Sequence, residues 1–132
     1  DAYFKFIVEL KRFSYSNIYN NWRLLEFQRY AQGILSCIYR VLIQTQVYAQ
    51  NGTMEKCLRY APNLSHTYID WLVKYSNYKG RGEEDRKASL HYQTQEVFDV
   101  FDNESYEKCV IEYISGMTDQ YAITVYNEIL SF

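Results

Sequence analysis

Residues that interrupt helices are scarce in this sequence, which has one proline and five glycines among its 132 residues. Proline removes a backbone N–H donor and glycine weakens helices, so a chain with few of either can form long helices. No segment shows a convincing alternation of apolar and polar residues, the pattern typical of strands. These absences predict one all-α domain over residues 1–132, a helical bundle of about five to seven helices with one long central helix.

Cysteines are also few, and Cys37, Cys57 and Cys109 are widely spaced with no CxxC pair. An odd number of cysteines in this spacing indicates reduced thiols, as in cytosolic proteins. The sequence has neither the run of about 18–20 apolar residues that a membrane-spanning helix needs nor a positively charged, apolar leader. We therefore expect a cytoplasmic protein with no membrane partner.

A strong charge of either sign is missing, because the formal net charge is −2. Dedicated nucleic-acid-binding domains carry clustered basic residues, so no such site is expected. Tyrosine is abundant instead, with 15 residues. A tyrosine ring buries apolar area while its hydroxyl needs a polar partner, which suits half-buried helix contacts and interfaces.

The spacing of apolar residues predicts the first helices. A stripe that includes Phe4 and Val8 indicates one helix, and residues 14–17 offer turn and capping residues after it. Apolar residues then recur every three or four positions without a proline, which predicts a helix of about 29 residues over about 21–50. Gly52 is expected to end this helix, because glycine readily adopts the left-handed conformation.

Shorter elements are expected in the middle of the chain. Thr53 is expected to cap a helix that reaches Tyr60, and Ser65 is expected to cap the next one. Residues 77–88 are charged and include two glycines, so we expect a mobile loop there. The Gly-Arg-Gly spacing at 80–82 matches no phosphate-binding pattern.

The last third has the clearest helical period. Apolar residues from Tyr106 to Met117 follow the helical template, with a cap expected at Asp102. Gly116 is expected to interrupt or kink this helix, and Thr118 to cap a second one that continues to the end of the chain.

No catalytic centre is visible in the sequence. A metal ion that activates water needs several converging histidine and aspartate side chains. His66 and His91 are each followed by a residue other than aspartate, so surface or capping roles are expected for both. We expect no catalytic residue, no metal ligand and no cofactor in this chain. Asp119 stands apart from the other carboxylates, since it follows Gly116 and a capping threonine and can project into a cleft as well as cap a helix.

The run from Glu112 to Ala122 reads Glu-Tyr-Ile-Ser-Gly-Met-Thr-Asp-Gln-Tyr-Ala. It resembles the D-Y-I-[AS]-G-M-T-D-R-Y-A signature near the C-terminus of bacterial HD-domain deoxynucleoside triphosphate triphosphohydrolases, the dGTPase-like family. Residues 5–45 resemble the same C-terminal region more weakly. Glu112 replaces the usual aspartate, and Gln120 replaces an arginine, which removes a cation that could bind phosphate through two hydrogen bonds.

The resemblance implies a C-terminal accessory region that packs on an N-terminal HD domain, which this chain lacks and which holds a divalent metal. The implied parent reaction is hydrolysis of a dNTP, such as dGTP, to the deoxynucleoside and triphosphate. The accessory region would help to shape the nucleotide pocket and the contacts of a homo-oligomer. Asp119, Tyr121 and Gly116 are the residues expected to face the substrate or the HD domain, and the chain alone is expected to be inactive.

Two alternatives remain open. The chain begins at Asp1 within an apolar pattern, as expected of a fragment, but a stand-alone, non-catalytic helical protein-interaction module would also use a tyrosine-rich surface. A helical bundle that binds a small ligand is the third reading.

Overall fold

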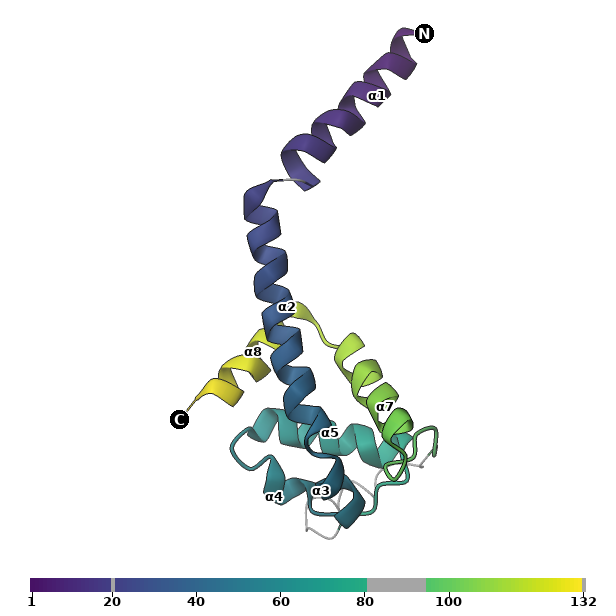
Figure 1. Ribbon diagram of the computed structural model, residues 1–132, viewed down its shortest axis with the longest axis vertical. Helices are drawn as coiled ribbons and strands as arrows, with labels where there is room; N and C mark the ends of the chain where they lie inside the picture. Colours follow the sequence, from purple (N-terminus) through teal and green to yellow (C-terminus); the bar gives the residue numbers. More distant parts are fainter. Residues whose placement is uncertain (20, 81–94, 132) are drawn as a thin grey trace. The chain divides into compact units, whose positions relative to one another are not determined.

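The computed structural model describes residues 1–19, 21–80 and 95–131, which belong to two compact units, Asp1–Gly33 (unit 1) and Ile34–Phe132 (unit 2). Every regular element in the described residues is a helix, and the number of helices lies within the expected range (Figure 1). The all-α prediction is therefore confirmed. The single domain over 1–132 stays a prediction, and most of the expected loop at 77–88 lies outside the described residues.

Unit 1 contains α1 (Ala2–Ser14), the π-helix η1 (Tyr15–Tyr19) and the first part of α2 (Trp22–Ile43). The turn expected at 14–17 is wrong, because the backbone continues into η1. The Asn17 side chain donates to the Phe13 carbonyl at 3.1 Å, so it supports the helical backbone where a turn was expected.

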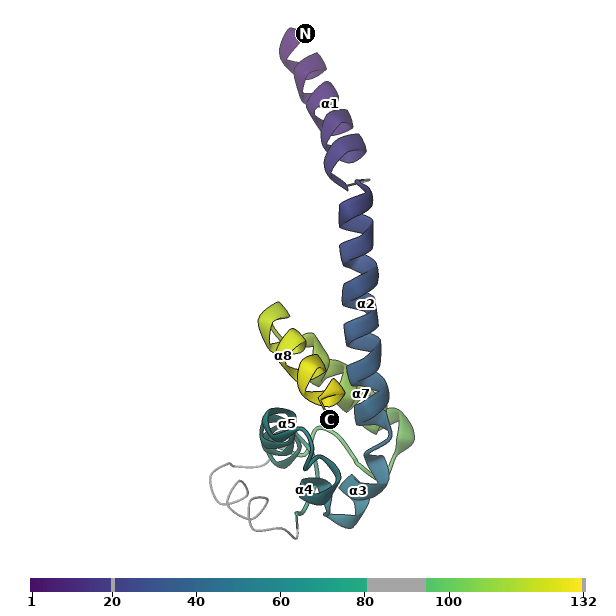
Figure 2. The same ribbon diagram turned by 90° about the vertical axis from the view of Figure 1, so that its left-hand side faces the viewer.

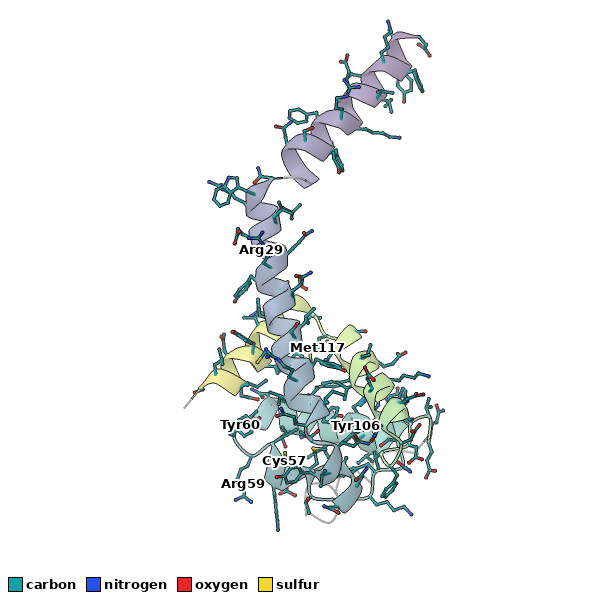
Figure 3. The ribbon with its side chains drawn as sticks, viewed as in Figure 1. Arg29, Cys57, Arg59, Tyr60, Tyr106 and Met117 are labelled. Atoms are coloured by element: carbon teal, nitrogen blue, oxygen red, sulfur yellow. The ribbon has the colours of Figure 1, made fainter. Side chains whose placement is uncertain are left out.

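Unit 1 buries none of its described side chains. The side chains of α1 stand out on all sides of the helix (Figure 3). The large apolar side chains of the unit that face solvent are Tyr3, Phe4, Phe6, Val8, Leu10, Phe13, Tyr15, Trp22, Leu25, Phe27 and Tyr30. So many exposed large apolar side chains are unusual for a folded protein, in which a large exposed apolar surface typically marks a contact site.

The helix expected over 21–50 is divided in two. It consists of α2, with 22 residues, and α3 (Gln46–Asn51), with six. The division lies at Thr45, whose hydroxyl donates to the Leu42 carbonyl at 2.5 Å and so satisfies a carbonyl at the end of α2. The predicted stop is confirmed, because Gly52 takes the left-handed conformation with φ 70°.

The next two helices are α4 (Met54–Cys57) and α5 (Pro62–Tyr75). Thr53 precedes α4, but its side chain makes no capping hydrogen bond, which corrects the expected side-chain cap. Ser65 is not a cap either, since it is buried inside α5. Proline is favoured in the first turn of a helix because the N–H groups there have no partner within the helix, and α5 begins at Pro62, four residues earlier than a cap at Ser65 predicts.

A carboxylate from a distant helix satisfies the start of α5. Glu128 lies in α8 (Asp119–Leu130) and accepts from the backbone N–H groups of Asn63 at 3.1 Å and Leu64 at 3.0 Å. The first N–H groups of a helix have no partner within the helix and carry a positive partial charge, so a carboxylate there is stabilising.

The segment between α5 and α7 (Asn103–Ser115) is anchored where the structure describes it. Tyr78 is buried, and Ser76 forms an isolated bridge with Phe98. The side chains of Gln46 and Gln50 both donate to the Val100 carbonyl, at 3.1 and 3.2 Å. Two caps expected from the sequence are confirmed: Asp102 accepts from the N–H of Ser105, and Thr118 from that of Tyr121.

Unit 2 has one hydrophobic core. In Figures 1 and 2, α3 and α4 lie at one end of the unit and the corner between α7 and α8 at the other. Its fully buried side chains include Ile38, Leu42, Met54, Leu58, Leu64, Tyr68, Leu72, Val100, Tyr106, Cys109, Val110 and Val125. No helix in the described ranges is both long enough and apolar enough to cross a membrane.

A chain of hydroxyl groups runs through this core. Tyr68 donates to Tyr106 at 2.8 Å, and the Tyr106 hydroxyl lies 2.7 Å from that of Thr45, which donates to the Leu42 carbonyl. Each buried hydroxyl thereby has a partner, and the chain joins α5, α7 and the end of α2.

Replacing Glu128 with alanine should lower the free energy of unfolding by about 1–2 kcal/mol, because two N–H groups of α5 lose their partner. Urea unfolding measures the change. The matched control is Glu112→Ala, an exposed glutamate on α7, which should change stability by less than about 0.5 kcal/mol. Equal effects of the two variants would contradict the capping role.

Tyr106→Phe should cost about 1–2 kcal/mol in the same measurement, since the hydroxyls of Tyr68 and Thr45 both lose a buried partner. Tyr48→Phe is the matched control, because Tyr48 is exposed. A loss no larger in Tyr106→Phe than in the control would show that the hydroxyl chain contributes no stability.

Candidate functional site

A pocket of about 420 Å³ lies where α5, α7 and α8 meet, and we call it the α5–α7–α8 pocket. Two of its residues come from α5, and the others belong to the end of α7, the corner and the start of α8. The lining residues are Thr67, Trp71, Tyr113, Gly116, Met117, Thr118 and Tyr121. Five of the seven belong to the eleven-residue run from 112 to 122, so the corner places the run against α5.

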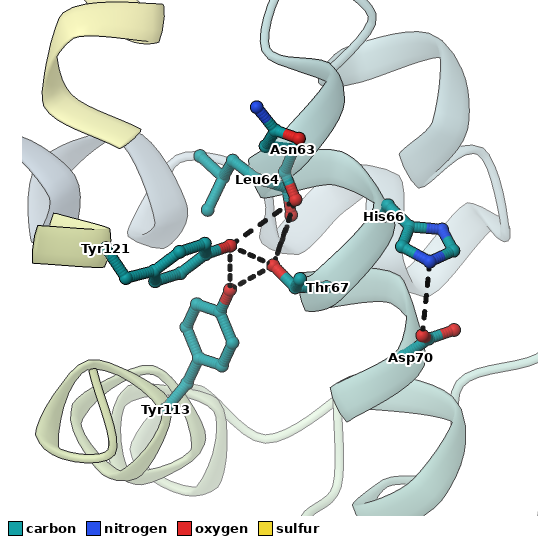
Figure 4. Close-up of polar contacts among 7 residues, drawn as sticks. All are labelled: Asn63, Leu64, His66, Thr67, Asp70, Tyr113 and Tyr121. Carbon is teal, nitrogen blue, oxygen red and sulfur yellow. Dashed lines mark hydrogen bonds and ion pairs between the residues drawn. The ribbon is translucent and has the colours of Figure 1, made fainter. Parts of the chain in front are cut away.

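Three hydroxyl groups converge in the pocket. The Thr67 hydroxyl lies 2.6 Å from that of Tyr113 and is also hydrogen-bonded to that of Tyr121. Thr67 donates to the Asn63 carbonyl at 3.0 Å, and the Tyr121 hydroxyl lies 3.4 Å from the same oxygen. Figure 4 shows the two tyrosine hydroxyls pointing toward Thr67 from two different helices. The cluster therefore joins α5, α7 and α8 at one point.

Trp71 forms a fixed aromatic part of the pocket. Its indole N–H donates to the Cys109 sulfur at 3.2 Å. Its ring centroid lies 4.6 Å from that of Tyr75 and 5.8 Å from that of Tyr113. These contacts hold the indole in one orientation.

Burial keeps the hydroxyls and the thiol around this region protonated. It raises the pKa of Tyr106 to about 12 and the pKa of Cys109 to about 11, and it is the largest cause in both cases. Burial also raises the pKa of Tyr113 and that of Tyr68. These groups therefore act as neutral hydrogen-bonding groups near neutral pH, with no nucleophilic thiolate among them.

The structure brings together two of the three residues predicted to face substrate or an HD domain. Gly116 and Tyr121 line the α5–α7–α8 pocket, whereas Asp119 is exposed in the first turn of α8 and is not among the lining residues. A Cβ at Gly116 would lie 3.6 Å from its nearest neighbour, the Tyr113 carbonyl, which is an ordinary contact. Gly116 ends α7 as expected, but no close backbone approach requires a glycine there. The functional roles of all three residues stay predictions.

The one histidine among the described residues, His66, does not line the pocket. The His66 side chain is 74% exposed and lies 3.8 Å from the Asp70 carboxylate, on the opposite side of α5 from the hydroxyl cluster (Figure 4). His91 lies outside the described residues. No three His, Cys, Asp or Glu side chains of the described residues come close enough to hold a metal ion, so these residues do not fit a metal centre.

Thr67 and Trp71 were missed in the sequence. They lie four positions apart and so share one face of α5, and Trp71 is one of only two tryptophans. The four-residue spacing of Thr67 and Trp71 is visible in the sequence, but no local pattern indicates which helix packs against this face of α5.

Alkaline pH should destabilise the protein. A folded-state pKa above the unfolded value contributes stability in full below the unfolded pKa, about 9 for cysteine and 10 for tyrosine. That stability is lost as the pH rises through the folded values, about 11 for Cys109 and 12 for Tyr106. Urea unfolding at a series of pH values, with tyrosinate absorbance recorded in parallel, should show the free energy of unfolding falling above pH 9. A constant value up to pH 12 would contradict it.

One comparison with known proteins gives a match. Residues 69–128 match the family model of the phosphohydrolase-associated domain. No curated protein and no solved structure matches the chain. The matched range includes every lining residue of the pocket except Thr67. The match supports a helical region associated with HD phosphohydrolases.

Proposed function

We propose that this chain is the helical accessory region of a dNTP triphosphohydrolase and that it packs on an HD domain that holds the divalent metal. The observation that carries the proposal is the phosphohydrolase-associated match over 69–128, within which the run from Glu112 to Ala122 resembles the dGTPase-like signature. The HD domain would release triphosphate from a dNTP such as dGTP. No step of that reaction is assigned to the described residues.

The apolar surface of unit 1 supports a partner that covers it. Phe4 is 67% exposed and Trp22 is also 67% exposed. Rings of this size bury about 150–250 Å² each when they are covered, which is a large favourable term for association. An HD domain, or a second copy of the chain in a homo-oligomer, would supply that cover. A stand-alone interaction module would use the same surface, and the test below separates the two.

Both Gly116 and Tyr121 lie in the pocket beside the corner of α7 and α8. We infer that this pocket opens toward the nucleotide site of the assembled enzyme, and that exposed Asp119 faces the substrate or the HD domain. Both inferences rest on the resemblance and on where these residues lie within unit 2.

A tagged copy purified from its native cells should be recovered with an HD-bearing polypeptide, either continuous with the chain or bound to it. Peptide mass spectrometry identifies the polypeptide, and metal-dependent release of triphosphate from a dNTP panel tests the activity. Phe4→Ser should lower recovery or activity several-fold because it removes an apolar contact, whereas the neighbouring Lys5→Ser should not.

Two results would contradict the proposal. The first is recovery of the chain with no HD-bearing sequence, which would favour the stand-alone interaction module. The second is metal-dependent triphosphate release by the purified chain alone, which would show that the catalytic site lies within it.

A further inference from the structure

We propose that the α5–α7–α8 pocket binds the uncharged base of a nucleoside and takes no part in holding phosphate. The inference deepens the proposed function and rests on it for the class of substrate. It concerns binding alone and involves no chemical step.

The size and lining of the pocket suit such a ligand. Its volume of about 420 Å³ lies within the usual range for small-molecule sites, about 300–1,000 Å³. Apolar and aromatic groups line most of it, with a few hydroxyls on one side. A nucleobase has the matching chemistry, because it presents two apolar faces and a polar edge.

The absence of charged lining residues indicates that the pocket suits the base of a nucleotide and not its phosphates. None of the seven lining residues carries a formal charge, so no cation is present to pair with phosphate. Burial is the main cause of the raised pKa of Tyr113, and the negative charge of the Asp70 carboxylate adds a smaller contribution in the same direction. Gln120 stands where the resembled signature has arginine, which removes a further cation from this corner. A triphosphate would find no cationic partner among the lining residues.

Trp71 supplies a surface for stacking. Stacking of a base on an aromatic side chain is worth about 1–3 kcal/mol and tolerates any base, because every base has a π-face. The bond to Cys109 and the ring contact with Tyr75 already hold the indole. Binding therefore costs little side-chain entropy.

The hydroxyl cluster supplies the polar contacts. A hydroxyl can donate one hydrogen bond and accept two, so Tyr113 and Tyr121 keep acceptor capacity beyond the bonds of the cluster. Thr67 donates to the Asn63 carbonyl and accepts from both tyrosines, so it orients their hydroxyls. The edge of a base carries both donors and acceptors, and its donors can bond to these free acceptor positions. An aliphatic ligand would leave this capacity unused.

The two tryptophans make a direct test possible. Trp22 is exposed in unit 1, so Trp22→Phe leaves Trp71 as the single tryptophan reporter of the full chain. Deoxyguanosine and deoxycytidine should quench its fluorescence with saturation, whereas inorganic tripolyphosphate should neither quench it nor compete. Thr67→Val and Tyr121→Phe, each in this background, should weaken nucleoside binding about 2–10-fold, the loss expected for one hydrogen bond. Tyr48→Phe should leave it unchanged.

Several results would overturn the proposal: no saturable response to either nucleoside, competition by tripolyphosphate, or unchanged affinity in both hydroxyl variants. Urea unfolding checks that each variant folds, and Tyr121→Phe serves alone if Thr67→Val does not. Quenching by free tryptophan or phenol but by neither nucleoside would point to a protein side chain as the occupant and would also overturn it. Because binding is measured without turnover or an HD domain, its failure is distinguishable from failure of the proposed function.

Discussion

The buried hydroxyl groups of tyrosine are the constraint on which unit 2 depends. Tyr68 and Tyr106 are almost completely buried, and Tyr113 is 8% exposed, so their rings contribute apolar area while their hydroxyls lose water. An unpaired buried hydroxyl costs about 1–3 kcal/mol, a large part of the stability of a small domain. The structure avoids this cost by linking hydroxyls into chains that end on backbone carbonyls. Each chain joins helices that lie far apart in the sequence, so satisfying the hydroxyls also sets how those helices pack.

The same constraint produces the candidate site. Tyr68 and Tyr113 are in edge-to-face contact, with ring centroids 5.0 Å apart, and Tyr113 connects the core to the pocket. At the margin of the core the hydroxyl cluster reaches the partly exposed Thr67 and Tyr121, and the Tyr121 hydroxyl keeps acceptor capacity that a ligand can use. A feature that stabilises the fold thereby leaves a neutral, aromatic, hydrogen-bonding pocket at the corner of α7 and α8. This explains why the eleven-residue run contributes both buried residues and pocket-lining residues.

Units 1 and 2 differ in how far their apolar side chains are buried. Unit 2 buries them in one core, whereas unit 1 has the periodicity of amphipathic helices but no buried side chain among its described residues. A stripe at helical spacing shows that a helix has an apolar face, but it says nothing about what covers that face. Within unit 1 itself, the described residues do not cover this apolar face.

The sequence by itself determined the helical class, most helix positions and the caps at Asp102, Thr118 and Gly52. These features depend on periodicity and on hydrogen bonds between residues at most a few positions apart, so a single sequence contains them. Only the tertiary structure decided that α5 begins at Pro62 under Glu128, that the long helix divides at Thr45, and that Thr67 and Trp71 complete the pocket. These features involve contacts between residues tens of positions apart, such as the 61 between Thr45 and Tyr106 and the 64 between Leu64 and Glu128. Local sequence patterns do not indicate which distant side chain will pack at a given position.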